Sequence, residues 1–289
     1  MLRLVPDEAG GWSAPVARAA GAAGGGVDGP GTGTEPPVRT RLLGPGTRLR
    51  WRRSATETVL FGHPGAETCL YLRGASTGAA TVILGDDAAA GHLAQYVVPA
   101  GVGHTLSPSP GRHALWSEAS VGGVSRAAGW EFVDDAEAVL LRHPAPAPPR
   151  APGGPGVRPR LARAASARTP SAALSVLARP DSVRRLTTSG SDVTYLLHVG
   201  GPVHHVTIAP DGTVSEYVLG RDVARGHVPA VTVPAGWWRA SYLSERVPMA
   251  ATGELSQGPR LAGQVPVRAA DVLRTHPRLA KRLLRYAGA

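Results

Sequence analysis

A long internal repeat constrains the fold of this chain more than any other feature of its sequence. Residues 82–104 and 217–239 align without a gap at an offset of 135, and 10 of their 23 positions are identical. The identities include His92 with His227, so they are not confined to small residues. A repeat of this length predicts two homologous structural units.

The composition between the two copies predicts where one unit ends and the next begins. Residues 144–159 read PAPAPPRAPGGPGVRP, of which ten are proline or glycine, as is typical of an extended linker. We therefore expect an N-terminal domain over residues 1–143 and a C-terminal domain over residues 160–289. A second Gly-rich stretch, at 19–37, predicts a long loop inside the first domain.

Within each unit the hydrophobic pattern has the period of strands. The chain's 37 glycines and 27 prolines interrupt nearly every window that could form a long helix. Pro210–Gly212 separates two apolar runs and predicts a hairpin turn, while Gln95–Val98 and Ala230–Val233 have the pattern of strands that end at proline. Only residues 134–143 and 271–286 begin with acidic and end with basic side chains, which favours helices. The sequence predicts an all-β fold of two tandem barrels or jelly rolls with short C-terminal helices.

The overall composition excludes several classes of protein. The formal charge is +10, but all except one of the 31 basic residues are arginines spread along the chain, which disfavours a nucleic-acid partner. The single cysteine, Cys69, excludes an internal disulfide. No apolar stretch is long enough for a membrane helix, and the N-terminus lacks the pattern of a signal peptide. We therefore expect a cytoplasmic protein that does not bind membranes.

Short motifs in both copies resemble the cupin superfamily. PAGVGH at 99–104 resembles the second cupin motif, P-x-G-x-x-H, whose last histidine is often a metal ligand. LVPDEAGGW at 4–12, LGDD at 84–87 and VPAGWW at 233–238 resemble, in their order, a largely uncharacterised epimerase-like cupin family. The resemblance covers most of both copies, so the chain resembles a bicupin. It implies jelly-roll barrels that hold a ligand at their open end, and it does not imply one particular reaction.

The resemblance also implies a set of metal ligands, from which both copies depart. A metal-binding cupin supplies about three histidines and one glutamate to the barrel interior. In the first copy Trp51 stands at the position of the first histidine, which leaves Glu57, His63 and His104. The counterparts in the second copy cannot form a tight metal site: they are Leu186, Asp192, His198 and Arg239. We therefore expect no metal cofactor, and a divalent metal at the three remaining side chains of the first copy is the alternative.

Ionisable and aromatic side chains are the candidates for chemistry and binding. Glu57, His63 and His104 are candidate proton-transfer residues, because imidazoles and buried carboxyls can be tuned toward neutral pH. Glu57 and His63 have a structural interpretation as well, since both lie next to predicted turns. The side chains expected to bind a planar or anionic substrate are Trp51, Tyr96, Tyr195, His198, Trp238 and Arg239.

The first copy, which keeps more of these groups, is expected to hold the more open and more polar pocket. The second barrel is expected to be filled by its own side chains, including Tyr195, Trp238 and Arg239. An emptier second barrel would instead make Arg239 the leading anion-binding residue.

Three functions follow from these observations. The favoured one is a metal-independent enzyme of isomerase, cyclase, epimerase or dehydratase type that acts on a small organic substrate in secondary metabolism. A bicupin that binds a small molecule without catalysis and a metal-dependent cupin are the alternatives. The expected partner is a small-molecule substrate, and a homodimer is compatible with the sequence.

Overall fold

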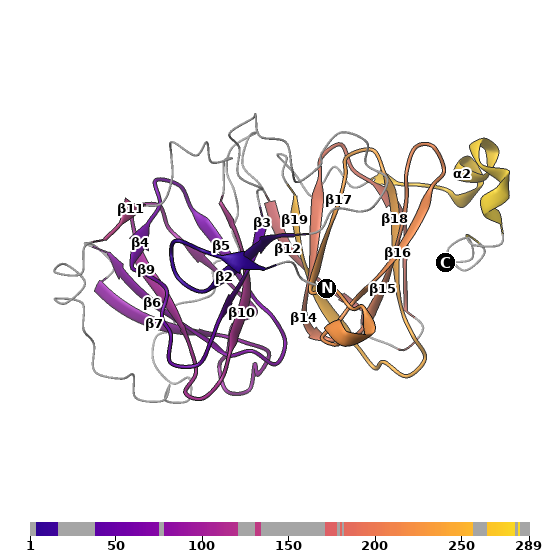
Figure 1. Ribbon diagram of the computed structural model, residues 1–289. Helices are drawn as coiled ribbons and strands as arrows, with labels where there is room; N and C mark the ends of the chain where they lie inside the picture. Colours follow the sequence, from indigo (N-terminus) through magenta and orange to yellow (C-terminus); the bar gives the residue numbers. More distant parts are fainter. Residues whose placement is uncertain are drawn as a thin grey trace. The chain divides into compact units, whose positions relative to one another are not determined.

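A computed structural model describes residues 4–16, 38–74, 78–120, 131–133, 171–177, 180, 182–256, 265–280 and 283 (Figure 1). The described residues belong to two compact units: an N-terminal unit with residues 4–15 and 38–133, and a C-terminal unit with the described residues from 171 onward, to which Val16 is also assigned. The predicted loop at 19–37, helix at 134–143 and linker at 144–159 lie outside the described residues.

The N-terminal unit consists of two antiparallel sheets. In sheet order, the first contains β1 (Val5–Pro6), β2 (Trp12–Pro15), β3 (Val38–Leu43), β10 (Ala114–Ser120), β5 (Thr58–Gly62) and β8 (Gln95–Val98). The second contains β11 (Glu131–Phe132), β4 (Arg52–Arg53), β9 (Gly103–Pro108), β6 (Thr68–Gly74) and β7 (Gly78–Leu84). The apolar core lies between them, because alternate side chains of both sheets point to one shared interior. Leu43, Leu60 and Trp116 from the first sheet and Leu70, Leu84 and Leu106 from the second belong to this core.

The C-terminal unit also consists of two antiparallel sheets. In sheet order, the first contains β12 (Ser171–Leu177), β19 (Ala250–Ser256), β14 (Val193–Gly200) and β17 (Ala230–Val233). The second contains β16 (Val214–Leu219), β15 (Val203–Ile208), β18 (Trp238–Leu243), β13 (Val183–Thr188) and β20 (Val265–Pro266). A 3-10 turn, η2 (Val223–Arg225), follows β16, and the chain continues after β20 into α2 (Ala269–Thr275) and η4 (Pro277–Leu279).

The two units have the same strand order apart from β1 and β2, which have no counterpart among the described strands of the C-terminal unit. The order β3-β10-β5-β8 corresponds to β12-β19-β14-β17, and β11-β4-β9-β6-β7 corresponds to β20-β13-β18-β15-β16. Even an isolated parallel bridge recurs at the repeat offset, as Leu84 with Leu93 and Leu219 with Val228. The predicted all-β class is confirmed, and the sequence repeat is also a repeat of topology.

The most conserved element between the copies, Leu-Gly-x-Asp followed by Gly-His, has a packing role. A Cβ added to Gly85 would lie 2.7 Å from His92 Nδ1, and one added to Gly220 would collide with the ring of His227. His227 Nδ1 also accepts a hydrogen bond from the backbone N–H of Asp222, at 3.3 Å. Both histidines are half-buried against their glycines, and not exposed as their loop position suggests.

The C-terminal segment covers the outer face of the five-stranded sheet in its own unit (Figure 1). Val272, Leu279 and Leu283 pack with side chains that point away from the barrel interior: Leu186, Val206, Ile208 and Ala240. The segment also binds the predicted hairpin turn, where His276 Nε2 donates to the carbonyl of Pro210 at 3.1 Å. None of the described helices has the length and apolar character needed to cross a membrane.

Candidate functional site

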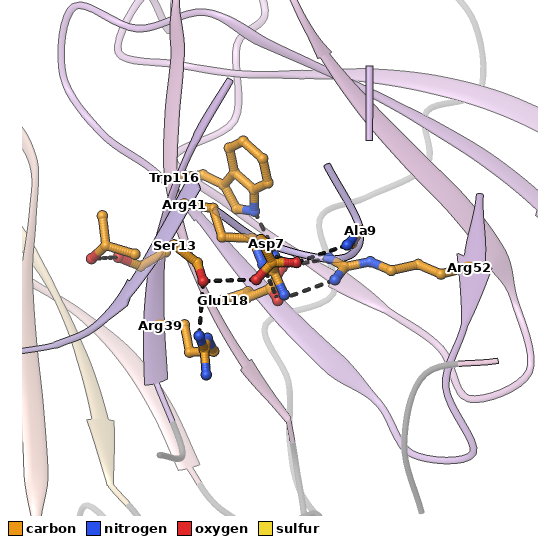
Figure 2. A network of polar contacts seen from close by, with 10 residues as sticks. Asp7, Ala9, Ser13, Arg39, Arg41, Arg52, Trp116 and Glu118 are labelled. Carbon is orange, nitrogen blue, oxygen red and sulfur yellow. Dashed lines mark hydrogen bonds and ion pairs between the residues drawn. The ribbon is translucent and has the colours of Figure 1, made fainter. Parts of the chain in front are cut away.

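Glu118 lies at the centre of a buried charge network inside the N-terminal barrel (Figure 2). On β10, Ala114 and Trp116 belong to the apolar core, and strand alternation carries Glu118 onto the same face. Its carboxylate accepts hydrogen bonds from Arg52 Nη2 at 2.5 Å, from Arg52 Nη1 at 3.2 Å and from Arg41 Nε at 2.5 Å. The indole N–H of Trp116 donates a further bond of 3.3 Å. The carboxylate is therefore held by two guanidinium groups in a buried site.

A second carboxylate, from the N-terminal motif, completes the charge balance of this barrel. Asp7 Oδ1 lies 2.7 Å from Arg41 Nη1, and Asp7 Oδ2 accepts a hydrogen bond of 2.7 Å from Ser13 Oγ (Figure 2). Burial would raise the pKa of Glu118, but the cations of Arg41 and Arg52 hold it well below its usual range. Two arginines and two carboxylates thus neutralise one another.

His104 lies in the same interior, where it is a cross-strand neighbour of Arg52. It is fully buried, and burial together with the positive charge of Arg52 lowers its pKa to about 3. The imidazole is therefore neutral at physiological pH. Its Nδ1 lies 3.5 Å from the carbonyl oxygen of Val102.

The structure does not bring the other two proton-transfer candidates to His104. Glu57 is exposed in the turn that precedes β5. His63 follows the end of β5 and forms a 2.8 Å hydrogen bond with Ser117 Oγ, on the face of β10 opposite Glu118. Trp51 is half-buried, and Tyr96 packs against the apolar core, where burial raises its pKa.

Arg239 is the feature that distinguishes the C-terminal barrel. It lies on β18, opposite Thr187 of β13 and Thr207 of β15, and its neighbours on the same face, Trp237 and Leu243, belong to the apolar core. The side chain is 1% exposed. Its Nε, Nη1 and Nη2 form no hydrogen bond of ordinary geometry with the described residues, and the Tyr195 hydroxyl lies close beside the guanidinium. The guanidinium is therefore a buried cation that the described part of the chain does not pair.

Two neutral polar side chains lie beside this cation. The Arg239 guanidinium carbon is 5.5 Å from the centre of the Tyr195 ring, and the centres of the Tyr195 and His205 rings are 4.4 Å apart. Burial raises the pKa of Tyr195, so its hydroxyl stays protonated. Burial and the cations of Arg239 and Arg184 lower the pKa of His205 to about 3, so its ring stays neutral. Ser241 Oγ holds His205 Nδ1 at 2.6 Å, while Nε2 has no partner among the described residues.

The remaining predicted binding residues of the second copy lie outside this interior. Trp238 points to the outer face of the sheet, where its ring is 5.6 Å from the ring of His276. Our expectation that Trp238 fills the barrel is thus corrected, because Trp238 packs on the outer face, where the C-terminal segment covers part of it. His198 lies against Gly253, on the face of β14 opposite Tyr195.

The residues of the two barrels do not fit the metal that cupins often carry. Within the described parts of the chain, no three side chains of the types His, Cys, Asp or Glu are grouped closely enough to hold a metal ion. Of the alternative ligand set, only His104 points into the barrel.

Sequence reasoning missed the network of Glu118, Arg41 and Arg52 and the role of His205. Glu118 lies within the run Leu-Trp-Ser-Glu-Ala, and its counterpart Glu254 lies within Ala-Thr-Gly-Glu-Leu. A charged residue recurring inside an apolar strand in both copies was the available signal.

Comparison with known proteins supports the cupin assignment for one part of the chain. Residues 144–255 match the family model described as Cupin superfamily (DUF985). No curated protein matches the chain.

Solved structures with a similar course of the chain include an oxalate decarboxylase. The W96Y variant of oxalate decarboxylase from Bacillus subtilis is 11% identical over 84% of this chain and 74% of its own, with a TM-score of 0.46. The same enzyme at pH 4.6 is 11% identical over 85% of this chain and 75% of its own, with a TM-score of 0.47. Protein SO0799 from Shewanella oneidensis is 21% identical over 48% of this chain and 82% of its own, with a TM-score of 0.38. The family match is therefore a similarity of residues 144–255 to the cupin superfamily.

Proposed function

We propose that this chain is a bicupin that binds a small organic anion inside its C-terminal barrel, without a metal. The domains of this proposal are residues 1–143 and 160–289, joined by 144–159, and the shared strand order of the two units supports it.

The buried guanidinium of Arg239 carries the proposal. Burial of a charge without a partner costs several kcal/mol. An arginine that is 1% exposed and has three unpaired nitrogens among the described residues is therefore unfavourable unless an anion joins it. Guanidinium groups bind carboxylates and phosphates through parallel N–H bonds, which specifies both the sign of the ligand and its geometry.

Binding has more support than the isomerase-type chemistry favoured from the sequence. That chemistry needs Glu57, His63 and His104 within reach of one substrate. Glu57 is exposed, and His63 lies on the opposite side of the first sheet from the barrel interior. The N-terminal barrel also fills its charged interior with its own carboxylates, Asp7 and Glu118. These placements favour a structural role for the first barrel and ligand binding in the second.

His205 favours a second candidate function, an isomerase-type reaction in the C-terminal barrel. Its ring is fixed by Ser241 while Nε2 has no partner among the described residues, as a proton-transfer group beside a bound substrate requires. Hydrogen exchange with D2O at a bound compound's C–H groups would test it. The natural protein should catalyse this exchange, and His205→Gln should lose it while still binding the compound. That result would favour this candidate over binding without catalysis.

Calorimetric melting of the full chain tests the proposed binding. Chloride, acetate, benzoate and phosphate would be titrated at constant ionic strength, because a ligand that binds only the folded state raises the melting temperature in a saturable way. We expect at least one anion to do so for the natural protein and for Arg246→Met, which removes an exposed arginine. We expect no such rise for Arg239→Met. Equal stabilisation of both variants, or none by any anion, would overturn the proposal.

A further inference from the structure

We infer that the anion held by Arg239 is an organic monocarboxylate, a conclusion that rests on the proposed function and specifies its ligand class. The evidence is a comparison of the two barrels. In the N-terminal barrel carboxylates of the chain neutralise both buried arginines, whereas in the C-terminal barrel no described carboxylate pairs with Arg239.

The charges inside the two barrels do not balance in the same way. The N-terminal barrel sets Arg41 and Arg52 against Asp7 and Glu118, so its interior is neutral. In the C-terminal barrel Glu254, the counterpart of Glu118, pairs with Arg184.

Arg239 then remains as a second cation, beside side chains that are neutral at physiological pH: Tyr195 and His205. The described interior of this barrel is therefore one negative charge short. A ligand with a single negative charge would make this interior neutral. A dianion such as phosphate at high pH would leave it with a net negative charge.

The sequence before the second copy contains no acid that could replace Asp7. Asp7 lies between β1 and β2, ahead of β3, and the stretch ahead of β12, the counterpart of β3, falls within residues 138–170. No Asp or Glu occurs between Glu137 and Asp181. That segment therefore cannot provide the missing carboxylate, whatever its conformation.

The N-terminal barrel shows how a carboxylate is bound in this fold. Arg52 grips both oxygens of Glu118 with its two terminal nitrogens, at 3.2 Å and 2.5 Å (Figure 2). Arg52 lies on β4, which pairs with β9, whereas Arg239 lies on β18, the counterpart of β9. The two terminal nitrogens of Arg239 have no carboxylate partner among the described residues. A planar carboxylate matches that fork, and the Tyr195 hydroxyl and His205 Nε2 supply polar groups next to it.

The apolar core of the C-terminal barrel favours an organic body on this carboxylate. Besides the polar groups around Arg239, this interior contains a cluster of apolar side chains that includes Leu197, Val203, Val231, Val233, Trp237 and Leu243. Such a cluster stabilises hydrocarbon and disfavours a strongly hydrated inorganic ion.

Titration calorimetry with matched pairs of small molecules tests the ligand class. The probes are acetate, butyrate and benzoate, their neutral amides, and sulfate and phosphate as inorganic anions. We expect at least one carboxylate to bind once per chain, with its amide and both inorganic anions weaker by about tenfold or more, as the loss of a charged hydrogen bond predicts. Arg239→Met should abolish the difference between acid and amide, and the exposed control Arg246→Met should keep it.

Arg239→Lys provides a second variant, because it keeps the charge and loses the fork. It should bind the same carboxylate about tenfold more weakly or worse, and it should discriminate less between carboxylate and sulfate. Sulfate or phosphate could instead bind more tightly than every carboxylate and lose this binding in Arg239→Met. That result would overturn the inference of a monocarboxylate ligand but would still support an anion site at Arg239. Absence of binding by all of these anions would instead overturn the proposed function itself.

Discussion

Arg52 and His104 face each other across β4 and β9, and at the equivalent pair of the C-terminal unit Thr187 faces Arg239. The guanidinium has therefore changed strands between the copies, while the barrel around it keeps its topology. In its first position the cation reaches Glu118. In its second it lies beside Tyr195 and His205, neither of which can neutralise it. The repeat thus produces one barrel with balanced charges and one with a surplus.

Glu118→Gln should strongly destabilise the N-terminal barrel. The substitution leaves Arg52 fully buried and Arg41 with one carboxylate partner, and breaking a buried pair from one side costs about 3–5 kcal/mol. Urea unfolding followed by tryptophan fluorescence measures the change. The matched control is Glu131→Gln, which breaks an exposed Arg–Glu pair with Arg53 and should cost under about 1 kcal/mol. Equal losses in both variants would show that the buried network does not stabilise the fold.

Acidification should destabilise the protein well above the pH at which most carboxylates titrate. His104 and His205 bind protons in the unfolded chain below about pH 6.5 but stay neutral in the folded chain down to about pH 3. Below that pH the unfolded state binds more protons than the folded state. The free energy of unfolding therefore decreases as the pH is lowered, by roughly 2–3 kcal/mol per histidine at pH 4.5. The lowered pKa of Glu118 adds a loss in the same direction at still lower pH.

Urea unfolding at several pH values between 7.5 and 4.5 measures this loss. The variant His104→Gln/His205→Gln should show a much flatter profile over that range. A natural protein whose stability does not change between pH 6.5 and 4.5 would contradict the neutral, buried state of both rings.

Gly220→Ala should destabilise the C-terminal unit because its new methyl group meets the ring of His227. Overpacking of this kind costs typically about 1–3 kcal/mol. The double variant Gly220→Ala/His227→Ala should recover a substantial part of that loss, which a double-mutant cycle on the free energy of unfolding measures. If the two effects simply add, the contact between glycine and histidine does not explain the repeated motif.

Chelation and removal of Glu57 should both leave anion binding unchanged. Glu57 is exposed, so Glu57→Gln should alter the free energy of unfolding by less than about 0.5 kcal/mol. Dialysis against EDTA, followed by the same titration of carboxylates, tests whether anion binding depends on a metal ion. Binding that disappears after dialysis and returns with one divalent ion would support the metal-dependent alternative.

The strands and turns could be predicted from the sequence because their signals are local. The hairpin at Pro210–Gly212 joins β15 to β16, and the strands at Gln95–Val98 and Ala230–Val233 have the predicted bounds. The helix predicted over 271–286 is interrupted, because α2 ends before Pro277 and a 3-10 turn follows, whereas Ala280 and Leu283 beyond that turn are again helical.

The candidate site was harder to predict because strand alternation does not tell which face is the interior. Trp237 and Trp238 must point to opposite sides, yet both look like core residues, because the C-terminal segment covers the outer side. The ion network has a related difficulty. Asp7, Arg41, Arg52 and Glu118 come from four separate elements, and no spacing in the sequence connects them.

The covering of the outer sheet by α2 and η4 affects how a single-barrel fragment should be cut. The family match ends at residue 255, one residue before the end of β19. A recombinant fragment trimmed to that match would lack Val272, Leu279 and Leu283, and it would bare the apolar outer surface formed by Val206, Ile208 and Ala240. Exposed apolar surface of this kind promotes aggregation. A fragment that extends at least to Leu283 keeps the side chains that cover this outer surface. An affinity tag should therefore be placed at the N-terminus of the fragment.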